Sequence, residues 1–88
     1  MGMSIDVEIR GKIKQIITNT TSIPTSEIAD TAAYKEDLGL DSLTILEITV
    51  DVDHEFDLEL PEEELAELRT VQDSVELVQK YLQKAAQV

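Results

Sequence analysis

The chain has 88 residues and a formal net charge of −12, from 19 acidic residues against 7 Lys and Arg. This charge disfavours nucleic acids and anionic membranes as partners, because both would repel the protein, and it favours enzymes with basic patches. The sequence contains no cysteine, so any thiol chemistry must come from a cofactor.

The length predicts a single domain over residues 1–88 and a thin core, with no room for a large internal active-site cleft. No apolar run is long enough to span a membrane, and the first residues lack the apolar core of a signal peptide. We therefore expect a cytoplasmic protein, acting as a monomer.

The first predicted helix covers about residues 5–19, where isoleucines recur at helical spacing and Ser4 is a candidate N-cap. A long connection follows over residues 20–40. Apolar residues punctuate it, so we expect it to pack on the body of the domain and to contain short turns of its own.

The second predicted helix begins at Ser42, after the chain break at Gly39 and the candidate N-cap Asp41, and runs to about Phe56. Its apolar residues fall on two opposite faces of a helical wheel. One face is predicted to meet the core: Ile45, Ile48, Val52 and Phe56. The other face carries Leu43, Leu46 and Val50, flanked by the acidic residues Glu47 and Asp51.

That second face has three interpretations. Its apolar residues are ordinary exposed side chains, or another helix covers them, or they form a docking patch for a partner. The charge pattern favours docking, because residues 36–68 contain many acids and no Lys or Arg. An apolar centre with an acidic rim suits a partner with a basic surface.

The remaining sequence predicts a short helix with Pro61 in its first turn, ending at Leu68, and then a last helix. Thr70 and Asp73 have the spacing of a capping box for that last helix, whose apolar stripe includes Val71 and Val75. The predicted fold class is all-α: an antiparallel four-helix bundle, three helices long and one short, with a long loop between helices one and two.

The segment Asp37-Leu38-Gly39-Leu40-Asp41-Ser42-Leu43 opens the second predicted helix. It resembles the prosthetic-group attachment motif of the acyl carrier proteins, and the resemblance extends from Ile9 to Leu82. In that family the serine after the aspartate carries 4′-phosphopantetheine, transferred from coenzyme A by a phosphopantetheinyl transferase. A serine on the first turn of a helix suits such a group, because free N–H groups and the helix dipole favour its phosphate.

The resemblance implies a non-enzymatic function, with acyl groups held as thioesters on an arm at Ser42 and presented to acyl-handling enzymes. The pathway stays open between fatty acid, polyketide and other acyl biosynthesis, while Leu40 between Gly39 and Asp41 disfavours an amino-acid carrier. No catalytic residue is expected, since His54 lies about three helical turns from Ser42. The resemblance and the helical wheel suggest candidates to line an acyl-chain cavity: Leu46, Ile48, Leu60, Leu68 and Val75.

An EF-hand-like calcium-binding protein is the alternative. Four acids occupy positions 1, 3, 5 and 12 of a possible calcium loop: Asp51, Asp53, Glu55 and Glu62. The sixth position of such a loop needs Gly for a sharp turn, and this chain has Phe56 there. The sequence therefore favours the carrier, with no dedicated metal site.

Overall fold

The computed structural model describes the backbone of residues 5–86 and the side chains of residues 6–83, so the candidate cap Ser4 lies outside it. This part of the chain forms four α-helices and one 3₁₀ turn: α1 (Ile5–Thr21), η1 (Thr25–Glu27), α2 (Ser42–Phe56), α3 (Glu62–Ala66) and α4 (Val71–Ala86). The predicted all-α bundle of three long helices and one short helix is confirmed. No described helix is both long and apolar enough to cross a membrane.

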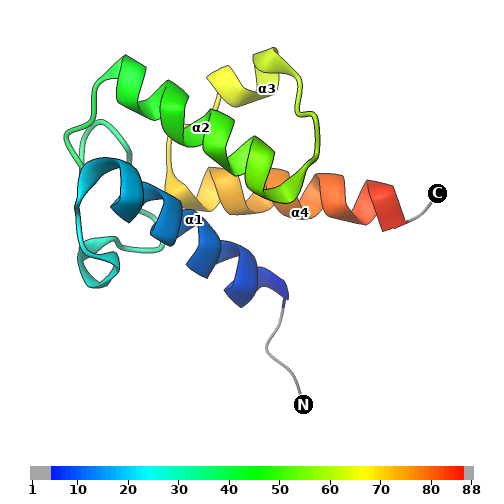
Figure 1. The fold of residues 1–88 in the computed structure, drawn as a ribbon, viewed down its shortest axis with the longest axis horizontal. Helices are drawn as coiled ribbons and strands as arrows, with labels where there is room; N and C mark the ends of the chain where they lie inside the picture. The colour runs from blue at the N-terminus through cyan, green and yellow to red at the C-terminus, as the bar shows by residue number, and fades with distance from the viewer. Residues whose placement is uncertain (1–4, 87–88) are drawn as a thin grey trace.

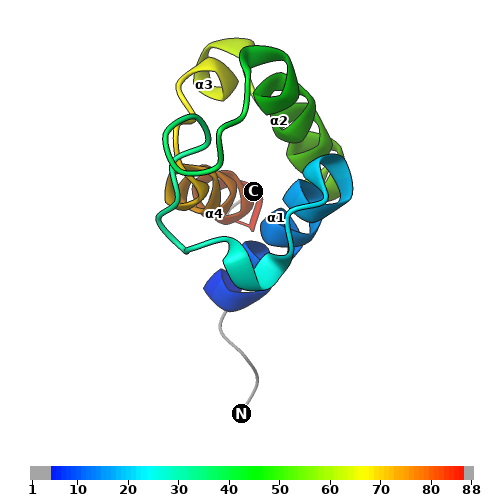
Figure 2. The same ribbon diagram turned by 90° about the vertical axis from the view of Figure 1, so that its left-hand side faces the viewer.

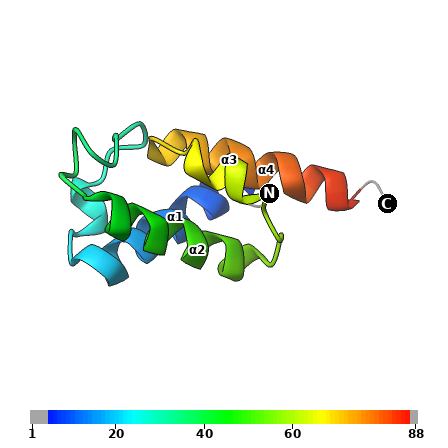
Figure 3. The ribbon, with the colours of Figure 1, turned by 90° about the horizontal axis from the view of Figure 1, so that it is seen from above.

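The three long helices enclose the core, with α1 packed against both α2 and α4 and running antiparallel to each of them (Figure 1). The short α3 packs against α2, and Figure 2, an end-on view, shows it beside α2 and above α4. Seen from above in Figure 3, α3 lies over the first half of α4. Branched aliphatic side chains from the three long helices are buried together: Ile9, Ile13, Ile17, Ile48, Val52, Val71, Val75 and Val78.

The long connection between α1 and α2 packs onto the bundle, as predicted. Ile28, Ala32 and Tyr34 are buried in the core. The loop is also tied to the start of α4 by two backbone hydrogen bonds, from the N–H of Tyr34 to the carbonyl of Arg69 (2.9 Å) and from the N–H of Val71 to the carbonyl of Ala32 (3.0 Å). These bonds fix the segment that leads into α2.

The capping box of α4 is present. The N–H of Asp73 donates to the Thr70 hydroxyl at 3.0 Å, and the Asp73 carboxylate accepts from the N–H of Thr70 at 3.2 Å. Each end of the box thus satisfies a backbone donor that the helix itself leaves unpaired.

Two helices end at slightly different residues than predicted. The first helix continues to Thr21, whose hydroxyl donates to the Ile17 carbonyl (2.7 Å), before the left-handed backbone of Ser22 ends it. The short helix stops at Ala66 instead of Leu68, and Pro61 precedes it as the N-cap with extended backbone. A turn follows the helix and brings Leu68 into the core.

Candidate functional site

Ser42 is the first residue of α2, and two neighbours fix its position. Gly39 adopts a φ of 66°, a left-handed conformation that favours glycine, and it turns the chain just before the helix. Asp41 then caps the helix, since its carboxylate accepts from the N–H of Thr44 at 2.8 Å. Hydrogen bonds from the backbone and then the side chain of Thr44 lower the pKa of Asp41. The predicted N-cap is confirmed.

The Ser42 side chain is exposed, as an attachment site requires. The Asp41 carboxylate accepts from the N–H of Thr44, and the Asp41 carbonyl accepts from the N–H of Ile45. Among the described contacts, the N–H groups of Ser42 and Leu43 have no hydrogen-bond acceptor. Unpaired N–H groups at the positive end of the helix dipole favour an anion. The donor set therefore fits a phosphodiester on the Ser42 oxygen, and the helix start would stabilise its negative charge.

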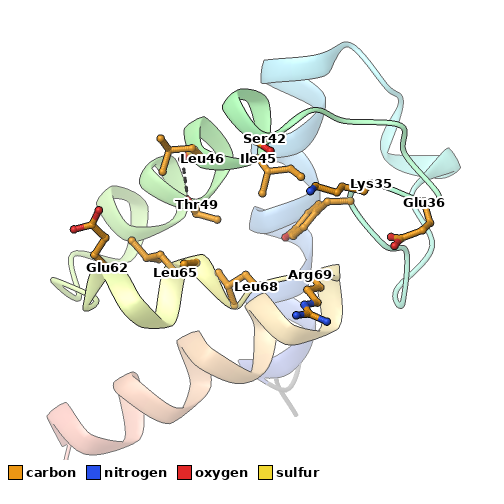
Figure 4. A pocket seen from close by; sticks show the side chains of 12 residues that line it. Lys35, Glu36, Ser42, Ile45, Leu46, Thr49, Glu62, Leu65, Leu68 and Arg69 are labelled. Carbon is orange, nitrogen blue, oxygen red and sulfur yellow. Dashed lines mark hydrogen bonds between the residues drawn. The ribbon is translucent and has the colours of Figure 1, made fainter.

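A cavity of about 610 Å³ opens beside Ser42, between α2 and α3 (Figure 4). Its α2 wall consists of Ser42, Ile45, Leu46 and Thr49, which share one helix face because they are spaced at i, i+3, i+4 and i+7. The other residues come from the long loop, from α3 and from the turn after it: Tyr34, Lys35, Glu36, Glu62, Leu65, Ala66, Leu68 and Arg69. The site thus combines an exposed hydroxyl with an adjoining space that is mostly apolar.

Comparison with known proteins agrees with this geometry. Residues 11–78 match the family described as phosphopantetheine attachment site. The chain is also 40% identical over 76 residues to an acyl carrier protein of Bdellovibrio bacteriovorus, an alignment that covers 86% of this chain and 92% of the relative. This chain belongs to the acyl carrier protein family. It is a non-enzymatic carrier, and the cofactor of the family is a covalently attached 4′-phosphopantetheine.

The cavity of this carrier differs from the one expected from the sequence. Leu46 and Leu68 line it, but three other candidates, Ile48, Leu60 and Val75, do not. Ile48 and Val75 belong to the core between the long helices, and Leu60 is buried after the end of α2, where its N–H donates to Asp53 at 2.9 Å. These three residues therefore do not line this cavity, and their contact with an acyl chain stays a prediction.

Sequence reasoning missed most of the cavity wall, including Ile45, Thr49 and Leu65. The signal was present for the α2 residues, because Ile45 and Thr49 follow Ser42 by three and seven positions and so share its face. Leu65 had no comparable signal, since five-residue α3 is too short to show a periodicity.

The second apolar face of α2, the one predicted to lie away from the core, is exposed to solvent. The side chains of Leu43, Leu46 and Val50 are 66%, 53% and 38% exposed, and Glu47 and Asp51 beside them are exposed as well. No other helix of the described chain covers this face. The five residues thus form one exposed surface, apolar with an acidic rim, that begins immediately after Ser42.

The EF-hand alternative finds no support. Asp51, Asp53 and Glu55 lie within the continuous helix α2, which extends through Phe56, so they do not form a calcium-binding loop with Glu62. Within residues 6–83, no group of three or more acidic or histidine side chains is arranged to hold a metal ion. The helix persists because Val52 and Phe56 continue its core face.

Proposed function

We propose that the Ser42 oxygen is the attachment point of the phosphopantetheine arm, and that the whole chain, residues 1–88, acts as one monomeric acyl carrier domain. The arm, when present, supplies the thiol that this cysteine-free chain lacks. Ser42 exposes the hydroxyl, Asp41 holds the first turn of α2 in place, and the free N–H groups of Ser42 and Leu43 favour the phosphate. The observation that carries this proposal is the exposed Ser42 at the mouth of the cavity.

The partners that we propose are a phosphopantetheinyl transferase and acyl-handling enzymes with basic docking patches. They would approach the exposed α2 face of Leu43, Leu46, Glu47, Val50 and Asp51, because it adjoins the loaded serine. The apolar residues would be buried on contact, and the acids would pair with basic residues of the enzyme. Acyl chains of the fatty acid or polyketide type fit the apolar part of the cavity at Leu46 and Leu68.

Mass spectrometry tests the attachment site. Incubation with coenzyme A and a phosphopantetheinyl transferase should add the mass of one phosphopantetheine to the wild type and none to Ser42→Ala. Ser74→Ala would perturb the core, so the exposed Ser26→Ala is the matched control and should load normally. Unchanged loading of Ser42→Ala, with its helical circular dichroism intact, would show that the arm is attached elsewhere.

A further inference from the structure

Two cationic side chains, Lys35 and Arg69, lie at the cavity beside Ser42. They are far apart in the sequence and bracket the acidic segment 36–68, which has no Lys or Arg of its own. The fold places both residues along the lining of one cavity, because the N–H of Tyr34 donates to the Arg69 carbonyl and thereby holds the long loop against the turn before α4. The cavity thus carries two cations, although the segment between them is acidic and contributes Glu36 and Glu62 to the same lining.

The side chains of Lys35 and Arg69 are exposed to solvent. The other Lys and Arg side chains that the structure describes each form an ion pair: Arg10 with Asp6, Lys12 with Glu55, Lys14 with Asp30 and Lys80 with Glu64. Within the same described part of the chain, Lys35 and Arg69 have no ion pair and no side-chain hydrogen bond. In a protein with such an excess of carboxylates, two unpaired cations at one cavity are unexpected.

The arrangement of charges around the cavity is uneven. In Figure 4, Lys35 extends from the loop toward Ile45 and Ser42, whereas Glu62 lies at the far end of the cavity, where α3 begins. Glu36 is also at the rim, on the loop next to Lys35. The apolar interior between these groups offers nothing to a charged ligand, so an anion that enters would remain near the two cations.

We propose that Lys35 and Arg69 bind an oxyanion of the loaded arm at the mouth of the cavity, which rests on the proposed attachment at Ser42. The oxyanion is either the phosphodiester next to Ser42 or a carboxylate on the acyl cargo. In both cases the chemistry is a charge-assisted hydrogen bond from an ammonium or guanidinium group to an anionic oxygen. Elsewhere on this acidic surface the same anion would be repelled.

The test compares melting temperatures at low salt for the apo, phosphopantetheine-loaded, butyryl-loaded and succinyl-loaded protein. The two acyl groups have equal carbon chains, and only the succinyl group carries a carboxylate. Lys35→Gln/Arg69→Gln is the test variant. Lys12→Gln is the control, because it also removes a positive charge but lies on α1, paired with Glu55, away from the cavity.

If the cargo carboxylate is the ligand, the succinyl form should melt about 2–6 °C above the butyryl form in the wild type and in Lys12→Gln. The double variant should lose that difference, as should the wild type in about 0.5 M NaCl. If the phosphodiester is the ligand, the two acyl forms should melt alike. The difference in melting temperature between the phosphopantetheine-loaded and apo forms should then be smaller or more negative in the double variant than in the wild type.

Mass spectrometry of each form precedes the melting experiment. A wild type that does not load on Ser42 contradicts the proposed attachment. The oxyanion site then fails with it, because the site needs the arm at Ser42. A fully loaded protein whose differences between the four forms are unchanged in Lys35→Gln/Arg69→Gln contradicts the oxyanion site alone. Because the forms are compared only within one variant, a small change in its intrinsic stability does not affect the outcome.

Discussion

The hydroxyl oxygen of Tyr34 lies 2.5 Å from the Ser74 oxygen, and this hydrogen bond joins the long loop to α4 inside the core. Both side chains are buried. Ser74 also contacts the Thr70 carbonyl, at 3.4 Å. Because Tyr34 is also part of the cavity wall, this pair fixes the wall that faces α2.

Tyr34→Phe should lower the free energy of unfolding by about 0.5–1.5 kcal/mol near neutral pH, because it removes one buried hydrogen bond. Urea unfolding followed by circular dichroism measures this change. Ser74→Ala should cost a similar amount, and the double variant should cost less than the sum of the two, since both remove the same bond. Strictly additive effects would show that the pair contributes nothing as a pair.

The same tyrosine should make the fold sensitive to alkali. Burial raises the pKa of Tyr34 to about 12, above the ordinary value of 10.0. The folded protein therefore keeps a proton that the unfolded chain loses, so this stabilisation is complete below about pH 10 and falls as the pH rises toward about 12. Between about pH 9 and pH 11, the wild type should lose more stability than Tyr34→Phe. Equal losses in the two proteins would contradict the assignment to Tyr34.

The two faces of α2 should respond differently to alanine. Ile48 is fully buried, so Ile48→Ala should lower the free energy of unfolding by about 2–5 kcal/mol. Leu43 is largely exposed, so Leu43→Ala should change it by less than about 0.5 kcal/mol while slowing loading by the transferase. Denaturant unfolding and single-turnover loading measure the two effects. If Leu43→Ala is destabilised as strongly as Ile48→Ala and yet loads normally, then docking has been assigned to the wrong face of α2.

Charge reversal on the exposed face should act on association. Glu47→Lys should slow binding to a basic transferase several-fold at low salt, because it replaces an attraction with a repulsion, and added salt should reduce the difference. Glu8→Lys makes the same charge change on α1 and is the matched control, since Glu8 is exposed and lies away from Ser42. Equal slowing by the two variants would mean that only the net charge matters.

The sequence predicted the helices well where one strong pattern governed each of them. The start of α2 followed from Asp41 and Ser42, and its two apolar faces followed from a wheel. The cavity lining was predicted less well, because the helical wheel assigned Ile45 to the core alone and gave no role to Thr49, whereas both residues also face the cavity beside Ser42. The presence of Lys35 and Arg69 at the same cavity could not be predicted at all, since it depends on a loop-to-turn hydrogen bond that has no sequence signature.

The acidic segment 36–68 should make the apo protein sensitive to salt. In the part of the chain that the structure describes, Glu55 and Glu64 are the acids of this segment that form ion pairs, so the others repel one another across α2, α3 and the turn between them. The melting temperature should rise with added NaCl, because screening weakens this repulsion, and it should rise further with millimolar magnesium or calcium bound diffusely.

A neutralised variant separates this local repulsion from a general effect of salt. Glu47 and Asp51 lie one turn apart on α2, and like charges at that spacing destabilise a helix. Glu47→Gln/Asp51→Asn should therefore melt higher than the wild type at low salt and gain less from added NaCl. Glu8→Gln, which removes an exposed acid of α1 outside the acidic segment, should leave the salt response almost unchanged. A wild-type melting temperature that does not depend on ionic strength would show that the acids of α2 and α3 do not strain the fold.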